Sequence, residues 1–106
     1  MINCVFVTVP NKKEANKIAS ALIKDRLVAC VNIVDNIKSV YRWKGKVENS
    51  KELLLIIKTK KSAVVKLIKK IKSLHSYTVP EIIAFPITGG NKEYLEWVND
   101  SLATTD

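Results

Sequence analysis

Three of the expected strands are apolar on both faces, and this feature most limits what the chain can fold into. Residues 2–9, 53–57 and 82–85 each place apolar side chains at both odd and even positions. Because successive side chains of a strand point to opposite faces, a sheet with one face in water would alternate apolar and polar residues. Burying one Leu, Ile or Val contributes about 1.5–3 kcal/mol, against a domain stability of ~5–15 kcal/mol. We therefore predict that helices cover one face of the sheet and that other copies of the same chain cover the second.

Length and charge narrow the class of protein. The 106 residues are expected to form a single domain, residues 1–106. No uncharged apolar run approaches the roughly 20 residues that cross a bilayer, so no membrane is expected as a partner. The net charge of +8 comes mainly from lysines on expected helix surfaces, such as Lys66 and Lys72, and no Arg-rich run interleaves with aromatic residues. We interpret these lysines as a solvated face and expect no nucleic acid as a partner.

The N-terminus and the cysteines predict where the chain resides. Residues 1–7 carry no basic leader, and Pro10 interrupts the apolar stretch before any cleavage-site pattern. The only two cysteines, Cys4 and Cys30, form no CxxC pair, which suits a reducing compartment. We expect cytoplasmic residence and no disulfide.

The order of the expected elements defines the fold class. Apolar, β-branched runs predict strands at 2–9, at 28–34 with a continuation at 40–43, at 52–58 and at 80–87. Helical spacing predicts helices that begin after Asn11, near residues 59–62, and after Asn91, with the two asparagines as N-caps. Residues 35–36 predict a bend, and residues 44–46 a glycine-bearing turn. This order predicts an α+β, ferredoxin-like βαββαβ sandwich with a long hairpin between its second and third strands and a C-terminal helix.

A histidine and a glutamate lie where the second helix is expected to pass into the last strand. His75 is the only histidine, and Glu81 follows six residues later. Imidazole and carboxylate are suitable ligands for a borderline divalent metal, but a tight site usually needs three or four ligands. The alternative is that His75 is a residue at a helix C-terminus, where it favours the helix dipole, and that Glu81 is a solvated residue at a strand start.

Two further groups of side chains are candidates for binding. Gly89 and Gly90 precede the last helix, whose N-terminus attracts anions, but the segment lacks the Lys and Ser or Thr of a P-loop. The aromatic residues either pack in the core or line a cleft between subunits, as aromatic residues do in both places. These residues are Tyr41, Trp43, Tyr77, Tyr94 and Trp97.

No set of residues points to catalysis. A Ser/His/Asp or Cys/His arrangement cannot be recognised with any specificity, because every such proposal would have to use the same single histidine. We expect the protein not to be an enzyme.

Several segments, taken together, resemble the CutA divalent-cation tolerance family of bacterial type. The resemblance spans nearly the whole chain. It rests on the residues 41–46, 52–59, 80–83 and 94–97, with support from 7–11 and 27–32.

The resemblance implies a ferredoxin-like subunit in a homotrimer whose sheets pack toward the interior and whose helices lie outside. It also implies tolerance of divalent metals, with copper or zinc as the bound ion and no settled enzymatic reaction. By the family pattern, His75 and Glu81 match two metal ligands, whereas Val7 stands where relatives carry a cysteine. Losing that thiolate should weaken copper selectivity, because thiolate favours Cu(I). Cys4 and Cys30 are not expected to replace it.

The leading hypothesis is a non-enzymatic homotrimer that binds divalent metal ions weakly, through His75 and Glu81, at clefts between subunits and in response to metal. An alternative is a trimeric signalling or scaffold module resembling PII proteins, with a small anionic ligand or an unidentified partner protein. Its anion contacts would be Lys58, Thr59, Gly89 and Gly90. A third, an RNA-recognition module, shares the topology, but residues 53–57 are aliphatic where exposed aromatic residues would be needed.

Overall fold

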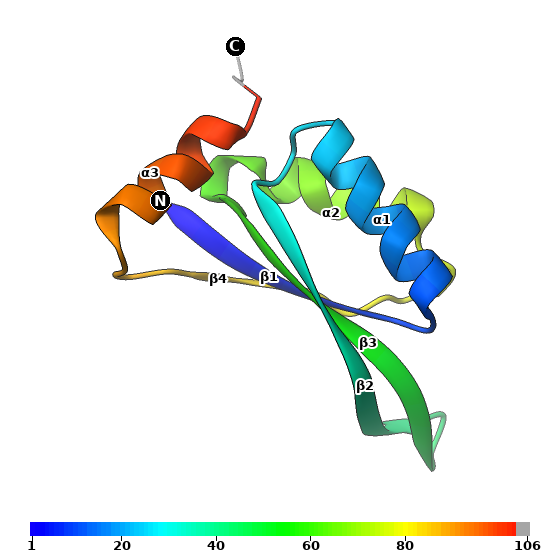
Figure 1. Ribbon diagram of the computed structural model, residues 1–106. Coiled ribbons are helices and arrows are strands. Elements are labelled where there is room, and N and C mark those ends of the chain that lie inside the picture. The colour runs from blue at the N-terminus through cyan, green and yellow to red at the C-terminus, as the bar shows by residue number, and fades with distance from the viewer. Residues whose placement is uncertain (104–106) are drawn as a thin grey trace.

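The computed structural model describes residues 1–103 and has the predicted α+β, ferredoxin-like order of elements. A four-stranded antiparallel sheet in the order β2-β3-β1-β4 forms one layer, and α1 and α2 lie together on one side of it (Figure 1). The elements are β1 (Ile2–Val9), α1 (Lys12–Lys24), β2 (Cys30–Trp43), β3 (Lys46–Lys60), a 3-10 turn (Lys61–Ala63), α2 (Val64–Leu74), β4 (Ile82–Pro86) and α3 (Lys92–Ser101).

The long hairpin of β2 and β3 extends well beyond the rest of the sheet (Figure 1). Lys44 and Gly45 form its two-residue turn with φ values of 50° and 80°, the left-handed conformation that a type I′ turn requires. The predicted bend is present, because the β2-β3 register shifts between Val34 and Ile37, and Asn36 has φ 59°. β3 is longer than predicted, since its first residues are polar and pair only with β2 in the projecting part of the hairpin.

Helix starts follow the predicted caps. The side-chain oxygen of Asn11 accepts a hydrogen bond from the Glu14 amide at 2.8 Å, and that of Asn91 accepts one from the Glu93 amide at 3.1 Å. The second helical segment begins with the 3-10 turn at Lys61, inside the predicted range. Thr59 belongs to β3 instead, where its buried hydroxyl donates to the Leu27 carbonyl oxygen at 2.8 Å.

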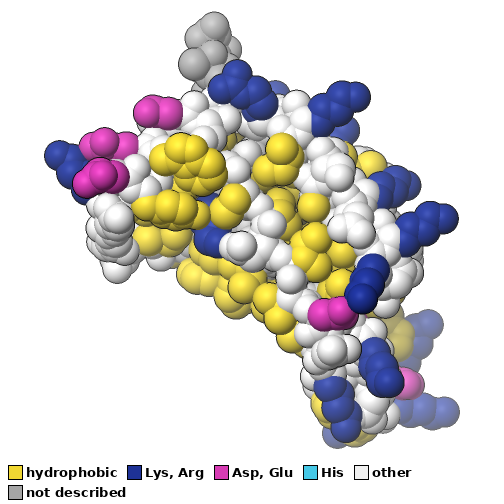
Figure 2. All heavy atoms as spheres, in the orientation of Figure 1, with side chains coloured by type: hydrophobic (Ala, Val, Ile, Leu, Met, Phe, Trp, Pro, Cys, Tyr) yellow, Lys and Arg dark blue, Asp and Glu magenta, His cyan; other side chains and the backbone are white. Residues whose placement is uncertain are grey.

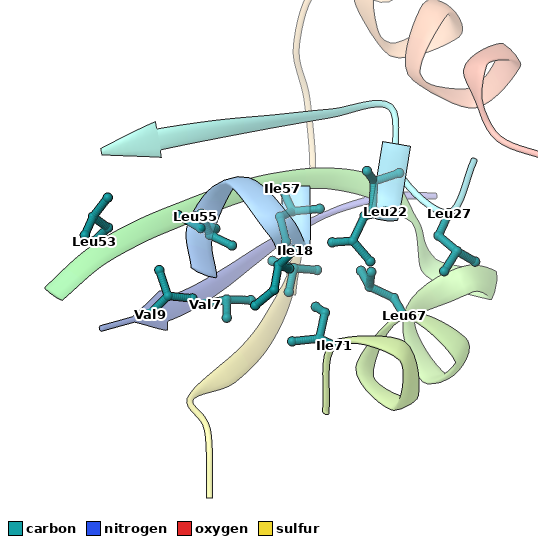
Figure 3. Close-up of a cluster of buried hydrophobic side chains, with 13 residues drawn as sticks. Val7, Val9, Ile18, Leu22, Leu27, Leu53, Leu55, Ile57, Leu67 and Ile71 are labelled. Carbon is teal, nitrogen blue, oxygen red and sulfur yellow. The ribbon is translucent and has the colours of Figure 1, made fainter. Parts of the chain in front are cut away.

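The core lies between the sheet and the pair α1 and α2 (Figure 3). Alternate residues of β1 and β3 point into it and meet the apolar stripes of the two helices, as the helical spacing predicted. The completely buried members with large side chains include Val5, Val7, Val9, Ile18, Leu22, Leu55, Ile57, Leu67 and Ile71. A smaller cluster of Ala63, Val98 and Leu102 fixes α3 against one end of the sheet.

The opposite sheet face is largely uncovered within one chain. Cys4 and Phe6 lie on this face, because their neighbours Val5 and Val7 point into the core. Their β4 partners in the register, Phe85 and Ile83, keep 40% and 51% of their surface exposed. Phe6 and Phe85 pack edge to face with ring centroids 5.0 Å apart.

We call the sheet face that carries Cys4, Phe6, Ile83 and Phe85 the open face. Its apolar side chains agree with the prediction that the strands are apolar on both faces. The helix that could cover it, α3, packs at the end of the sheet near Ile2 and Ala29, and its Tyr94 reaches Cys30, but it leaves Ile83 and Phe85 exposed. It stays a prediction that further copies of the chain cover the open face, and that the assembly is a homotrimer. Among residues 1–103, no helix is long and apolar enough to span a membrane.

Candidate functional site

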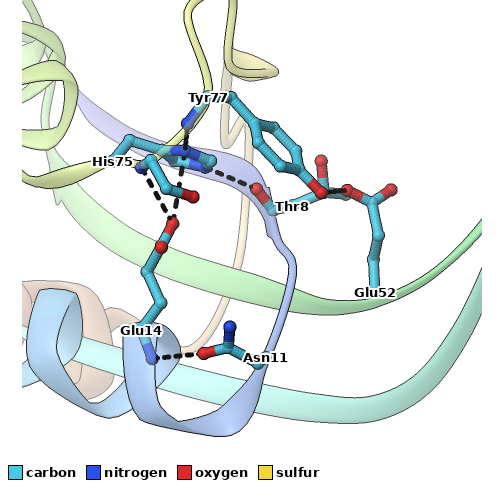
Figure 4. Close-up of polar contacts among 7 residues, drawn as sticks. Thr8, Asn11, Glu14, Glu52, His75 and Tyr77 are labelled. Atoms are coloured by element: carbon cyan, nitrogen blue, oxygen red, sulfur yellow. Dashed lines mark hydrogen bonds and ion pairs between the residues drawn. The ribbon is translucent and has the colours of Figure 1, made fainter.

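The segment between α2 and β4 carries both predicted metal ligands. α2 ends at Leu74, and the next residue, His75, adopts an extended conformation that turns the chain away from the helix axis. Its amide still donates to the Ile71 carbonyl oxygen at 2.9 Å. The segment then passes the end of β1, so that the imidazole of His75 lies against Thr8 (Figure 4).

Both ring nitrogens of His75 have partners. The Tyr77 amide donates to Nδ1 at 3.0 Å, and Nε2 lies 2.8 Å from the carbonyl oxygen of Thr8. The Tyr77 N–H at Nδ1 and the Thr8 carbonyl at Nε2 fit a ring whose Nε2 carries the proton, and a carboxylate oxygen of Glu14 also lies 3.3 Å from Nδ1. The side chain has no exposed surface. His75 is therefore a buried imidazole at the C-cap of α2, the helix-end position that the alternative gave it.

Glu14 is a neighbour of His75 that the sequence did not reveal. Its Oε2 lies 3.3 Å from His75 Nδ1 and accepts a hydrogen bond from the Ser76 amide at 3.2 Å (Figure 4). Glu14 follows the cap Asn11 by three residues, which is the spacing of an N-terminal capping box. Only half of that box forms, because the carboxylate turns to the segment after α2, which lies about 60 residues away in sequence.

A second buried carboxylate, Glu52, lies on the other side of the same segment. The Tyr77 hydroxyl donates to Glu52 Oε2 at 2.9 Å, and Glu52 is only 6% exposed. Burial, followed by the hydrogen bond to Glu52 and the charge of that carboxylate, raises the pKa of Tyr77. Leu53 faces the core, so Glu52 points toward the open face.

The resulting site is a polar network that joins β1, α1, β3 and the segment after α2. His75 and Tyr77 stack at a centroid distance of 4.8 Å, with Glu14 on one side and Glu52 on the other. Each carboxylate accepts a hydrogen bond from the segment, which is what buried charges need. The network fixes the path of the segment into β4.

Glu81 lies outside this network. It is exposed and precedes the first residue of β4. Within residues 1–103 neither a hydrogen bond nor an ion pair joins it to His75, and no group of three or more His, Cys, Asp or Glu side chains is placed to hold a metal ion. Val7, the residue that the resemblance implied in place of a cysteine, is completely buried. The pair of ligands His75 and Glu81 stays a prediction.

The five predicted cleft aromatic residues lie at three places in the chain. Tyr41 and Trp43 are on the projecting hairpin, where the Tyr41 hydroxyl lies 2.7 Å from Ser50 Oγ. Tyr77 belongs to the polar network. Tyr94 and Trp97 stack on α3 at a centroid distance of 5.6 Å. One chain therefore forms no single aromatic cleft within the part that the structure describes.

Tyr94 also contacts a cysteine. Its hydroxyl lies 3.5 Å from Cys30 Sγ, and this hydrogen bond, together with burial and the charge of the thiolate, raises the pKa of Tyr94 to about 12. Both cysteines are free thiols, as expected.

The four predicted anion contacts are not gathered in one pocket. Gly89 and Gly90 line an open hollow of about 600 Å³, but two carboxylates, Glu96 and Asp100, line it against one lysine, Lys92, so the net charge of its lining is negative. Thr59 is buried and uses its hydroxyl on Leu27, while the Lys58 ammonium donates to the Asn32 side chain. Anion binding by these four residues stays a prediction that the geometry does not favour.

Comparison with known proteins identifies the family. Residues 3–101 match the sequence profile described as CutA1 divalent ion tolerance protein. The divalent-cation tolerance protein CutA of Thermus thermophilus is 50% identical over 95% of this chain and 98% of its own length. A chloroplastic CutA of Arabidopsis thaliana is also 50% identical over 92% of this chain, which spans 53% of that relative.

Solved structures agree with these matches. The T. thermophilus protein superposes with a TM-score of 0.95 over 97% of this chain and all of the other, at 50% identity. A CutA from Archaeoglobus fulgidus, described as periplasmic, gives a TM-score of 0.92 at 40% identity over 95% of this chain and 98% of its own. Since relatives are named chloroplastic or periplasmic, cytoplasmic residence stays a prediction for this chain. On the family profile and these identities, the chain belongs to the CutA1 divalent ion tolerance family.

Proposed function

We propose that this chain serves divalent-cation tolerance as a non-enzymatic homotrimer that binds copper or zinc ions weakly at clefts between its subunits. The observation that carries the metal-binding part is the place of His75 in the same short segment as the exposed carboxylate of Glu81. The Tyr77 amide donates to Nδ1 of His75, so this nitrogen presents the lone pair with which an imidazole ligates metals.

The contacts of His75 explain why such binding would be weak. A metal ion that takes Nδ1 has to displace the hydrogen bond from the Tyr77 amide, whose net contribution is about 0.5–1.5 kcal/mol. Val7 supplies no thiolate, so the donors are nitrogen and oxygen, which suit Zn²⁺ and Cu²⁺ better than Cu⁺. Because one chain offers two predicted ligands, the others would come from solvent or from a neighbouring subunit.

Assembly is supported by the open face. Ile83 and Phe85 on β4 remain about half exposed, and on the same sheet face the hairpin adds the exposed side chains of Tyr41 and Trp43. Exposed apolar surface of this kind marks an association site. A trimer that covers this surface would leave the segment from His75 to Glu81 near the junction between subunits.

Sedimentation equilibrium tests the assembly. We expect a trimer for the wild-type chain and a shift to smaller species for Ile83→Asp, because a charge would then be buried in the interface. Val65→Asp, on the outer face of α2, is the control and should leave the mass unchanged. A monomeric wild-type chain would contradict the proposal.

Calorimetric titration tests the metal site. Copper and zinc ions are titrated into the wild type and into His75→Ala, Glu81→Gln and the control Glu93→Gln, which removes an exposed carboxylate on α3. We expect at least about tenfold weaker binding in the first two variants, since each loses one of few ligands. Unchanged affinity in both would rule out this site.

A further inference from the structure

Two segments account for the net positive charge of the chain. Residues 11–26 and 60–75, which contain α1 and α2, carry eleven of the eighteen Lys and Arg residues but only two of the ten Asp and Glu residues. These segments therefore have a net charge of +9, compared with +8 for the entire chain. Figure 2 shows Lys and Arg side chains along the α1 side of the molecule, whereas Asp and Glu side chains gather over α3.

The two carboxylates of these segments do little to neutralise the lysines. Glu14 is turned inward, to His75 and the Ser76 amide. Asp25, just after α1, is the other carboxylate, and it forms an exposed ion pair with Lys70 at 3.2 Å. α2 itself contains no acidic residue.

A hollow lies where this charge is densest. It has a volume of about 510 Å³, and its walls come from the C-terminal end of α1 and the outer side of α2. We call it the lysine hollow, and its lining residues are Asp25, Leu27, Lys66, Lys69, Lys70 and Ser73. A concave volume of this size is typical of small-ligand sites.

The three lysines are placed to act on one ligand. Lys66, Lys69 and Lys70 are three and four residues apart, so they share one face of α2, where like charges repel and destabilise the helix. Among residues 1–103, Lys66 and Lys69 form no ion pair. A bound polyanion would relieve this repulsion, and lysine ammonium groups bind phosphate oxygens as point charges.

We propose that the lysine hollow binds a small soluble anion that carries two or more linked phosphate groups. Its concave shape suits such a ligand better than a flat lipid surface. The lining carries three ammonium groups and the Asp25 carboxylate, and its ammonium groups are spread along one face of α2, which suits several linked phosphate groups better than a single orthophosphate. This site is separate from the metal ligands and from the open face, so it is independent of the proposed function.

Titration calorimetry at low ionic strength with inorganic tripolyphosphate, ATP and orthophosphate tests the proposal. We expect tripolyphosphate to bind at least tenfold more tightly than orthophosphate, and the affinity to fall with added salt because Lys66 and Lys69 are exposed. ATP distinguishes a nucleoside ligand from an inorganic one. If ATP binds more tightly than tripolyphosphate, the ligand contains a nucleoside; if ATP binds equally or more weakly, the ligand is inorganic. No binding of either ligand would overturn the proposal.

Matched variants locate the binding. The triple variant Lys66→Gln, Lys69→Gln, Lys70→Gln should weaken tripolyphosphate binding at least tenfold. The control Lys38→Gln, Lys46→Gln, Lys51→Gln makes the same charge change on the hairpin, and it should keep the affinity. Equal losses in both variants would show a diffuse charge effect and overturn the site.

A gain-of-binding variant adds a test that does not depend on removing lysines. Asp25→Asn removes the carboxylate that competes for Lys70, so tripolyphosphate should bind several-fold more tightly. Glu48→Gln on the hairpin gives the same change in net charge and should have no such effect. Tighter binding of single-stranded RNA or of anionic vesicles than of tripolyphosphate would overturn the proposal in favour of a macromolecular partner.

Discussion

Replacing His75 with alanine should destabilise the fold by about 3–4 kcal/mol. The side chain is completely buried and makes hydrogen bonds to Thr8 and Tyr77 at 2.8 and 3.0 Å. Each such bond contributes about 0.5–1.5 kcal/mol net, and its loss leaves a buried carbonyl oxygen and an amide without partners. The cavity left by the ring adds about 1–2 kcal/mol, below the cost of truncating a larger buried phenylalanine.

Urea unfolding followed by circular dichroism measures this loss. Wild type and variant are compared at equal protein concentration, because assembly makes apparent stability depend on concentration. Val65→Ala is the matched control: Val65 is on α2, which His75 directly follows, is 81% exposed, and its replacement should change the stability by less than about 0.5 kcal/mol. A loss below about 1 kcal/mol in His75→Ala would refute the view that this imidazole holds the segment to β1.

Three further changes test other contacts. Thr59→Val keeps the shape of a buried side chain but leaves the Leu27 carbonyl oxygen without its donor, so chemical denaturation should show a loss of about 1–2 kcal/mol. Gly45→Ala places a side chain at φ 80° in the hairpin turn and should cost about 1 kcal/mol by the same measurement. The raised pKa of Tyr94 means that its contribution to stability is present below pH 10 and lost between pH 10 and about 12. Cys30→Ala should lower the pKa of Tyr94, followed by ultraviolet titration, back toward 10. An unchanged pKa would exclude the hydrogen bond to Cys30 as the main cause of the shift.

Local patterns were enough to predict most of the fold. The caps at Asn11 and Asn91, the bend at residues 35–36 and the turn at residues 44–46 each depend on a few neighbouring residues, and all four are present. The apolar face that one chain leaves uncovered was also predictable, because the period of two along a strand is a property of the sequence itself.

The polar network could not be predicted in the same way. Its hydrogen bonds join residues far apart in sequence, such as Glu14 with Ser76 and Glu52 with Tyr77, and no spacing rule connects them. Glu14 lies three residues after the cap Asn11, yet its carboxylate accepts a hydrogen bond from the distant Ser76 amide. Local rules give the position of a side chain along its helix, and packing of the segment after α2 decides its partner.

The open face and the proposed metal ligands are physically connected. The segment from His75 to Glu81 passes from the core side, where Glu14 lies, to the open-face side, where Tyr77 reaches Glu52. Copies that cover the open face would therefore pack beside this segment. One chain supplies only two of the predicted metal ligands, and a neighbouring copy could supply the others. If a metal ion takes ligands from two copies, assembly raises the affinity for the metal by a certain factor. The bound metal must then raise the association constant of the subunits by the same factor. A site contained in one subunit has no such reciprocity. Two results therefore distinguish a cleft shared between subunits from a site within the single chain. With a shared cleft, the metal affinity falls when the protein is diluted, and the trimer resists dilution when metal is present.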